Sequence, residues 1–287
     1  MKKVLLATSA LFLTAGFASA EITMSGTAHA AMVATGAANA VVVTGADLNF
    51  GLSATADNGA TFSTTIDMGN GQTVDYNDDF ALDTQDRGAA APTIKIGYAG
   101  YTIEVANEAV DDLYDDAAAN HKDIGISGAV GGNTFAVAID TDDNKMSAKV
   151  GVALAGATIT YATSNEAGAN GGNSLAISYP MGDITLTASS NDNGTAKTTN
   201  KVGVSYKMDA LTIGYTLENA LEAGWSNYDL SVAYSAGALG ASFATDEAGV
   251  NKVVGTYDMG GGATMFASSK STKGTNNQQA FGVSFAF

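Results

Sequence analysis

Acidic side chains are the residues of this sequence with the clearest chemical potential, and they gather in two stretches. The first, EAVDDLYDDAAANHKD, spans 108–123, and the second, DYNDDFALDTQDRG, spans 75–88. Carboxylates at such density attract cations and repel anions at short range, which is how acidic rings select ions in pores. The acids of the first stretch that fit this chemistry are Glu108, Asp111, Asp112, Asp115 and Asp116.

The second stretch offers oxygen ligands of the kind that Ca²⁺ prefers, roughly six to eight in a site. The candidates are Asp75, Asn77, Asp78 and Asp79. The EF-hand pattern is absent, because counting from Asp75 there is neither a Gly at the sixth position nor a Glu at the twelfth. A solvated external loop without metal is the competing interpretation. No other cofactor is indicated.

Histidines are too few to suggest catalysis. The chain has two, His29 and His121, and it contains no GxSxG, HExxH, Walker or CxxC motif. His121 stands in the acidic stretch, where proximity to a carboxylate is expected by chance. We therefore expect no enzymatic activity.

The N-terminus predicts export. Two lysines, an apolar run over 4–17 and small residues at 18–20 form a secretory signal peptide with its cleavage site. The apolar run is shorter than the roughly 20 residues that a transmembrane helix needs. We therefore expect residues 1–20 to be removed on Sec export and residues 21–287 to form a single domain.

Charge and cysteine content narrow the class of partner. Removal of the two N-terminal lysines leaves 11 basic residues against 29 acidic ones, a formal charge of −18. Such a surface disfavours nucleic acid and favours cations. The chain has no cysteine, although an oxidising compartment would permit disulfides, so its stability must come from a large cooperative architecture.

Nearly every segment of the mature chain alternates apolar and polar residues. In KVGVSYKM, at 201–208, every second residue is apolar and the others are Lys, Gly or Ser. This period predicts strands with one apolar face. Eighteen are expected, at approximately 22–33, 46–56, 60–68, 92–98, 101–107, 123–130, 133–140, 145–154, 156–164, 173–180, 183–190, 198–207, 210–219, 226–235, 238–245, 250–258, 262–268 and 278–287.

The connections between these strands alternate in length. Short glycine-containing turns such as Ala99-Gly100 and Gly131-Gly132 occur at every second junction, and longer polar connections such as 108–122 lie between them. Short turns of this kind join hairpins. The pattern predicts an antiparallel meander with short turns at one end and long loops at the other.

Several architectures compete for such a meander. One open sheet would leave two exposed edges, and a β-solenoid would show a fixed repeat that the strand spacing lacks. A soluble sandwich or barrel is the general alternative. An exported chain with asymmetric loops is better explained by a closed barrel with apolar residues outward and polar ones inward. We predict an all-β fold, a transmembrane antiparallel up-and-down β-barrel in the bacterial outer membrane.

The last ten residues, QQAFGVSFAF, fit the closing strand of that barrel. Phe281, Val283, Phe285 and Phe287 alternate with small or polar residues and would face lipid. The terminal aromatic Phe287 resembles the signal by which outer-membrane barrels are handed to the barrel assembly machinery. An ordinary buried final strand is the alternative.

Three segments together resemble the general-diffusion porins, especially those of the alphaproteobacterial branch. They are the opening EITMSGTAHAAMV, IKIGYAGYTIEVANEAVDDLYDD at 94–116 and the closing AFGVSFAF. The resemblance implies about 16 strands, a homotrimer, passive diffusion of ions and small hydrophilic solutes, and a loop after 94–107 that folds inward to narrow the pore. The chain departs from the family at 105–107, where Val, Ala and Asn replace a frequent Gly-Arg pair, and its loop is short.

A set of lysines on the polar phase of the strands would line the lumen. If the acidic loop folds inward, its carboxylates and these lysines set up a transverse field, with a preference for cations. A solvated extracellular loop is the alternative for 111–116. The predicted basic wall consists of Lys95, Lys145, Lys149, Lys201 and Lys207.

Other functions and partners follow less directly. A substrate-specific channel for sugars would have aromatics along its lumen, but most tyrosines fall on the apolar phase. A closed structural or adhesin barrel would need bulky lumen residues, but small ones predominate. Divalent cations could bridge the acidic rim to anionic lipopolysaccharide. The small apolar phase of the first strand, Gly26, Ala28 and Ala30, predicts a flat contact between trimer subunits.

Overall fold

The computed structural model describes residues 20–85, 92–114, 120–166, 171–194, 198–220, 227–275 and 277–287. In this part of the chain no helix is long and apolar enough to cross a membrane. The predicted signal peptide lies outside the described residues except for Ala20, at which the first strand begins. Its cleavage stays a prediction.

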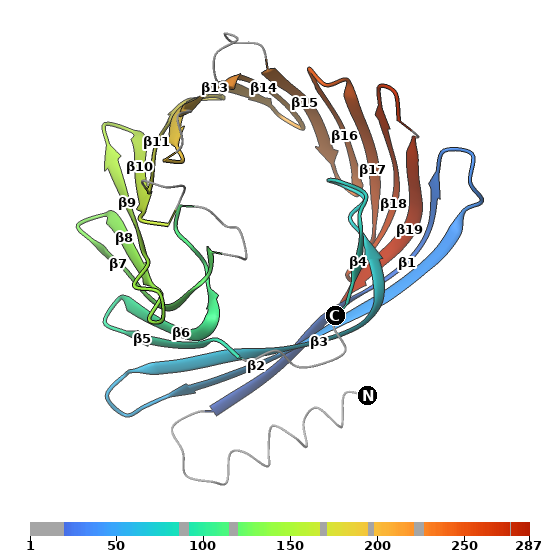
Figure 1. Cartoon of the computed structure of the whole chain (residues 1–287). Coiled ribbons are helices and arrows are strands. Elements are labelled where there is room, and N and C mark those ends of the chain that lie inside the picture. The colour runs from blue at the N-terminus through green and yellow to red at the C-terminus, as the bar shows by residue number, and fades with distance from the viewer. Residues whose placement is uncertain are drawn as a thin grey trace.

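Eighteen antiparallel strands form one closed ring, and a nineteenth, β4, pairs only with the end of β3. Each ring strand pairs with its sequence neighbours, and β1 also pairs with β19 (Figure 1). The strands are β1 (Ala20–Thr35), β2 (Val41–Thr55), β3 (Thr61–Val74), β4 (Leu82–Thr84), β5 (Ile94–Tyr98), β6 (Tyr101–Val110), β7 (Lys122–Val130), β8 (Asn133–Ile139), β9 (Met146–Leu154), β10 (Ala157–Ser164), β11 (Gly172–Met181), β12 (Ile184–Asp192), β13 (Thr198–Met208), β14 (Leu211–Ala220), β15 (Asn227–Ala236), β16 (Leu239–Asp246), β17 (Val250–Gly260), β18 (Ala263–Thr272) and β19 (Gln278–Ala286).

The C-terminus completes the closure. The backbone groups of Phe287 and Gly26 exchange two hydrogen bonds, of 3.0 and 3.1 Å. The pairing of β1 with β19 continues from Thr27 opposite Ala286 to Thr35 opposite Gln278. Every ring strand therefore has a hydrogen-bonded neighbour on each side, and the sheet closes without an edge strand.

The outer face is apolar, as the alternation predicts. In β13, Val202, Val204 and Tyr206 are exposed, and so are Phe281 and Phe285 of β19. Large apolar side chains on the outside of a closed sheet suit a hydrocarbon surrounding rather than water. The alternate positions, which carry Lys, Ser, Thr and Gly, face the interior of the ring.

The predicted strands and the strand count of eighteen are confirmed, whereas the count of 16 that the resemblance implied is wrong. The largest boundary errors are in one hairpin, because β2 begins at Val41 and β3 continues to Val74. The end of β3 reads GNGQTV, which lacks apolar alternation. Gly71, at φ +84°, approaches Thr44 so closely that an added Cβ would lie 2.2 Å from its carbonyl oxygen.

The predicted alternation of connections is confirmed from β5 onward, whereas the first two connections, 36–40 and 56–60, are equally long. Short turns join β5 to β6 and continue at every second junction to β17 and β18, and the longer connections lie at the opposite rim. In the first of these turns Ala99 and Gly100 have φ of +51° and +86°. Two consecutive positive φ values give the turn whose twist matches that of paired strands.

Candidate functional site

Two loops at the long-loop rim fold into the ring. We call them the Tyr76 loop, residues 75–81 between β3 and β4, and the Tyr114 loop, residues 111–114 after β6. Figure 1 shows the β3–β4 hairpin inside the wall formed by β16–β19, and the chain after β6 inside the ring on the opposite side. Each loop has its own set of contacts with the inner wall.

Hydrogen bonds tie the Tyr114 loop to the strands that follow it. The backbone N–H of Leu113 donates to Ser147 Oγ on β9 at 3.0 Å. The Tyr114 hydroxyl contacts the Asn191 side chain and lies 2.9 Å from the carbonyl oxygen of Asp192, both on β12. The loop therefore crosses the inner face of several strands instead of extending away from the rim.

A buried ionic cluster, which we call the clamp, fixes the same loop. Lys122 is fully buried, and its Nζ contacts Asp112 Oδ2 at 3.3 Å and the carboxylate of Glu166. Glu166 also pairs with Lys145 at 2.7 Å. Ser164 Oγ, on β10, donates to Asp112 at 3.3 Å. The clamp thus joins the Tyr114 loop, the start of β7 and the loop after β10.

The clamp shifts the pKa values of two of its members, Glu166 and Lys145. Burial alone would raise the pKa of Glu166, but hydrogen bonds from Lys122 and Lys145 outweigh it and hold that pKa below its ordinary value. The hydrogen bonds from Lys145 to Glu166 and Asp143 raise the pKa of Lys145. Both shifts favour the charged forms, so Glu166 and Lys145 are ionised at neutral pH.

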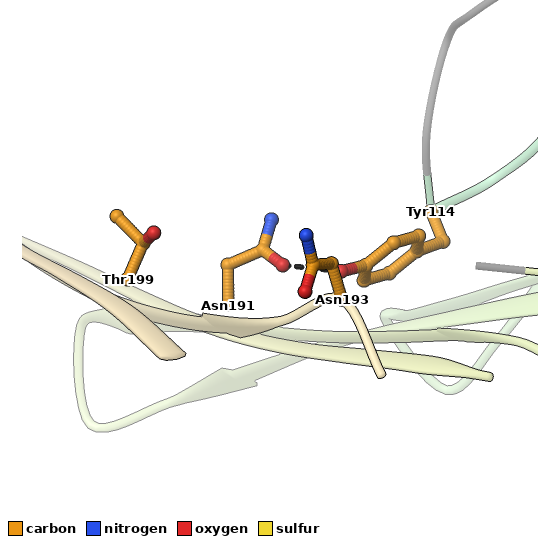
Figure 2. Close-up of a pocket in the computed structure, with 4 residues that line it drawn as sticks. All are labelled: Tyr114, Asn191, Asn193 and Thr199. Carbon is orange, nitrogen blue, oxygen red and sulfur yellow. Dashed lines mark hydrogen bonds between the residues drawn. The ribbon is translucent and has the colours of Figure 1, made fainter. Parts of the chain in front are cut away.

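A small polar pocket lies between Tyr114 and the strands it contacts. Its volume is about 270 Å³, and its lining is Tyr114, Asn191, Asn193 and Thr199. Figure 2 shows the Tyr114 hydroxyl reaching the Asn191 side chain. Neutral amide and hydroxyl groups of this kind bind water or sugar hydroxyls, and the four lining residues include no general base that would activate a hydroxyl.

Apolar packing holds the Tyr76 loop. The Tyr76 ring stacks on Phe266 of β18, with centroids 3.8 Å apart and planes 6° from parallel. Phe80 is 2% exposed although its backbone has φ +67°, a costly value for a bulky residue that packing must maintain. The wall side of this cluster comprises Ala31, Val33, Val43, Phe266 and Ala280.

Charged groups border the Tyr76 loop. Lys252 on β17 pairs with Asp78 at 3.0 Å, and Lys270 on β18 donates to the carbonyl oxygen of Asp79 at 3.0 Å. Asp229 and Asp246 stand directly opposite each other on β15 and β16. All these residues line one crevice of about 290 Å³ between the loop and the wall.

The structure places the predicted acids of the first stretch differently. Asp112 is buried in the clamp, so its carboxylate does not line an open path. Asp111 is 74% exposed at its side chain and lies 3.9 Å from His121 Nε2. Glu108 is exposed, and its backbone N–H donates to Asp123. Asp115 and Asp116 lie outside the described residues.

The predicted lysines do not form one continuous wall. Lys95 pairs with Glu104 across β5 and β6 at 3.2 Å, and Lys201 pairs with Glu218 across β13 and β14 at 2.5 Å. Lys145 belongs to the clamp and precedes β9 by one residue, so it is a loop residue. Two exposed strand residues remain, with no ion pair to another described residue: Lys149 and Lys207.

The described part of the second acidic stretch, residues 75–85, is not a solvated external loop, because Tyr76 and Phe80 dock it against the inner wall. Residues 86–88 lie outside the described residues. Within it Asp75 Oδ1 accepts from the N–H of Asp78, and Asp79 Oδ1 accepts from that of Ala81. Asn77 is exposed. In the described part of the chain no group of three or more His, Asp or Glu is arranged to hold a metal. Calcium binding there stays a prediction.

Several site residues were not predicted. The clamp members among them are Lys122, the first residue of β7, and Glu166, in the loop after β10, and no sequence motif marks either of them for burial. The Tyr76 loop had a signal, since Tyr76 and Phe80 are two aromatics in a stretch otherwise rich in Asp. Aromatic residues in a polar loop indicate docking against an apolar surface.

Solved structures with a similar fold were found among porins. A mutant of Rhodopseudomonas blastica porin has a TM-score of 0.59 and 17% sequence identity, and the match covers 93% of this chain and 100% of that one. The chain has the porin fold. A triple mutant of the same porin has a TM-score of 0.58 and 17% identity, and a further mutant has 0.58 and 18%, both with the same coverage. No family model and no curated protein matches the sequence. The porin fold therefore rests on the structure.

Proposed function

We propose that the chain is an outer-membrane porin, a water-filled channel for passive diffusion of ions and small hydrophilic solutes. One observation carries the proposal, namely a closed ring of eighteen strands with an apolar outer face and a polar inner face. Antiparallel barrels with this number of strands are wide enough to enclose an aqueous lumen. No catalytic role is proposed for either histidine.

Tyrosines at the short-turn rim support a membrane setting. Five of them lie on the outer face within three residues of a short turn, each 40–56% exposed. Rings with a polar tip at the boundary of an apolar band are typical of the aromatic girdles of membrane barrels. These residues are Tyr98, Tyr101, Tyr179, Tyr206 and Tyr234.

We further propose a preference for cations. The exposed carboxylates of Asp78 and Asp111 belong to loops that fold into the ring, with side-chain exposures of 75% and 74%. Of the inner-face lysines, Lys95 and Lys201 are neutralised by carboxylates on the neighbouring strand. The excess of acid over base in the mature chain adds to this field.

The outer face near the closing strands supports a homotrimer as a further proposal. Phe287 covers Gly26, the first residue of the predicted contact, whereas Ala28 is partly exposed and Ala30 exposed. A shallow apolar groove of about 380 Å³ surrounds Ala30. Replacing Ala30 by Lys should give monomers on mild-detergent gels. An unchanged trimer would remove this face from the interface.

Two partners of the outer surface remain proposals. The terminal ring of Phe287 is 56% exposed on the outer face, where the barrel assembly machinery could read it. Acidic residues at the long-loop rim could bind lipopolysaccharide through divalent cations.

Planar-bilayer recording of the refolded protein tests the proposed function. We expect large stepwise conductance in KCl and a reversal potential in a KCl gradient that indicates cation preference. The double variant Glu108→Gln and Asp111→Asn should reduce that preference, while the matched variant Glu247→Gln, at the turn after β16, should not. Folded protein without conductance would indicate a closed or gated barrel and overturn the proposal.

A further inference from the structure

The Tyr76 loop and the Tyr114 loop lie on opposite walls of the ring. The Tyr114 loop contacts β7, β9, β10 and β12. The Tyr76 loop contacts β17 and β18, and its apolar cluster extends to β1, β2 and β19. Four ring strands separate these groups on one side and three on the other. The two loops therefore lie against opposite sides of the ring interior, as Figure 1 shows for β4 and for the chain that follows β6.

The carboxylates of the two loops are used differently. In the Tyr114 loop, the carboxylate of Asp112 is buried in an ion pair with Lys122 of the clamp. In the Tyr76 loop the apolar residues make the buried contact with the wall. Asp78 and Asp79 remain exposed, although Asp78 pairs with Lys252. The docked side chains hold these two carboxylates at the inner wall, where solvated ions are expected to pass.

The wall beside the Tyr76 loop adds charge of the same sign. Asp229 and Asp246 face each other across adjacent strands, an arrangement that repulsion makes costly unless cations or lysines are close. Lys252 and Lys270 line the same crevice, and both bond to the Tyr76 loop. Four carboxylates thus stand beside two lysines on this wall.

We propose that the Tyr76 loop is a second pore loop, and that Asp78 and Asp79 determine the cation preference more than the acids of the Tyr114 loop do. The inference rests on the proposed function, because selectivity has meaning only in a conducting barrel. It moves the main selectivity element from the segment after β6 to the segment after β3.

Charge restoration at a single position tests the proposal, and the absence of native cysteine makes the labelling specific. Asp79→Cys should lower the cation preference in a KCl gradient. Reaction with an anionic methanethiosulfonate should restore it, and reaction with a cationic one should lower both preference and conductance further. The control is Ala38→Cys in the exposed β1–β2 connection. Its reversal potential and conductance should not change after labelling with either reagent. An Asp79→Cys channel that keeps the wild-type reversal potential and conductance, both unlabelled and after labelling with the cationic reagent, would overturn the proposal.

A second measurement tests the docking without any current. Val74 is 2% exposed in the apolar cluster, and cysteine is close to it in size. Val74→Cys in the folded barrel should react with a water-soluble maleimide at least about tenfold more slowly than Ala38→Cys. Adding Phe266→Ala should remove most of that protection. Equal maleimide reaction rates in Val74→Cys and Ala38→Cys would overturn the proposal of a second pore loop, even if the barrel conducts. Protection of Val74→Cys in a barrel that does not conduct would overturn only the proposed channel function.

Discussion

The Tyr114 loop and the Tyr76 loop both fold into the barrel, but opposite kinds of interaction hold them. The Tyr114 loop depends on a fully buried lysine between two carboxylates. The Tyr76 loop depends on two aromatic rings in a small apolar cluster, with charges only at its exposed edge. One attachment is therefore sensitive to protonation and to loss of a single charge, and the other to loss of apolar volume.

The difference shows that a high density of acids does not by itself identify the acids that line a path. The two stretches look alike in sequence, but the first places Asp112 in a buried ion pair, whereas the ion pair of the second, Asp78 with Lys252, lies at an exposed edge. Burial separates the two roles, because an ion pair that is removed from water is stable only with its partners in place.

Removal of the clamp lysine should have the largest effect. Lys122→Met leaves the buried Asp112 without a cation, and Glu166 keeps only Lys145 as its partner. Removing one partner of a buried ion pair costs about 3–5 kcal/mol. We expect the Tyr114 loop to detach while the barrel stays closed. Limited proteolysis of folded protein should then cut near this loop, and single-channel current should become noisier. The exposed Lys149→Met is the matched control, and a protected loop in Lys122→Met would show that hydrogen bonds suffice.

Loss of the aromatic stack should have a smaller effect on the other loop. Tyr76→Ala removes the ring on Phe266 and part of the apolar burial, together worth about 2 kcal/mol. We expect faster proteolysis of the Tyr76 loop and an unchanged Tyr114 loop. Tyr179→Ala, a truncation on the outer face, serves as control. If both loops loosened together, the two attachments would not be independent.

Acid should separate the loops without any mutation. Because the pKa of Glu166 in the folded protein lies below its ordinary value, the ionised Glu166 stabilises the clamp fully at neutral pH. This stabilisation is lost as the pH falls through the folded-state pKa of Glu166. The pKa of Lys145 is raised, so its contribution to the stability of the clamp is lost only as the pH rises above the ordinary range for lysine. Proteolysis with an acid-active protease should therefore detect the Tyr114 loop first as pH is lowered. Simultaneous release of the Tyr76 loop would contradict the comparison.

The smallest expected effect is at the exposed pair on β5 and β6. Glu104→Gln removes the partner of Lys95, and pairs of this exposure contribute about 0–1 kcal/mol. Stability in denaturant should hardly change, and cation preference should fall slightly because one lysine becomes uncompensated. A fall larger than that of Asp79→Cys would place the selectivity element here instead.

The strands could be predicted because apolar and polar residues alternate along them, so the type of each residue indicates whether it faces outward or inward. The same rule identified Phe281 and Phe285 as outward-facing and Lys95 and Lys201 as inward-facing. It failed at the end of β3, where glycine and polar residues carry no alternation, and at β4, which is three residues long.

The site was less predictable, because the two inward loops depend on contacts between distant segments. Tyr76 and Phe266 are nearly two hundred residues apart in sequence, and no local pattern pairs them. The burial of Lys122 likewise needs Glu166 from another loop. The sequence gives the positions of the acids, but which of them are exposed depends on contacts with distant residues that only the structure shows.

Liposome swelling with neutral sugars of graded size tests the central claim most directly. The account predicts that vesicles containing the refolded, unmodified protein swell at rates that fall smoothly with sugar size and are equal for stereoisomers. No swelling from folded protein, or a saturable rate for one sugar alone, would contradict a general diffusion channel.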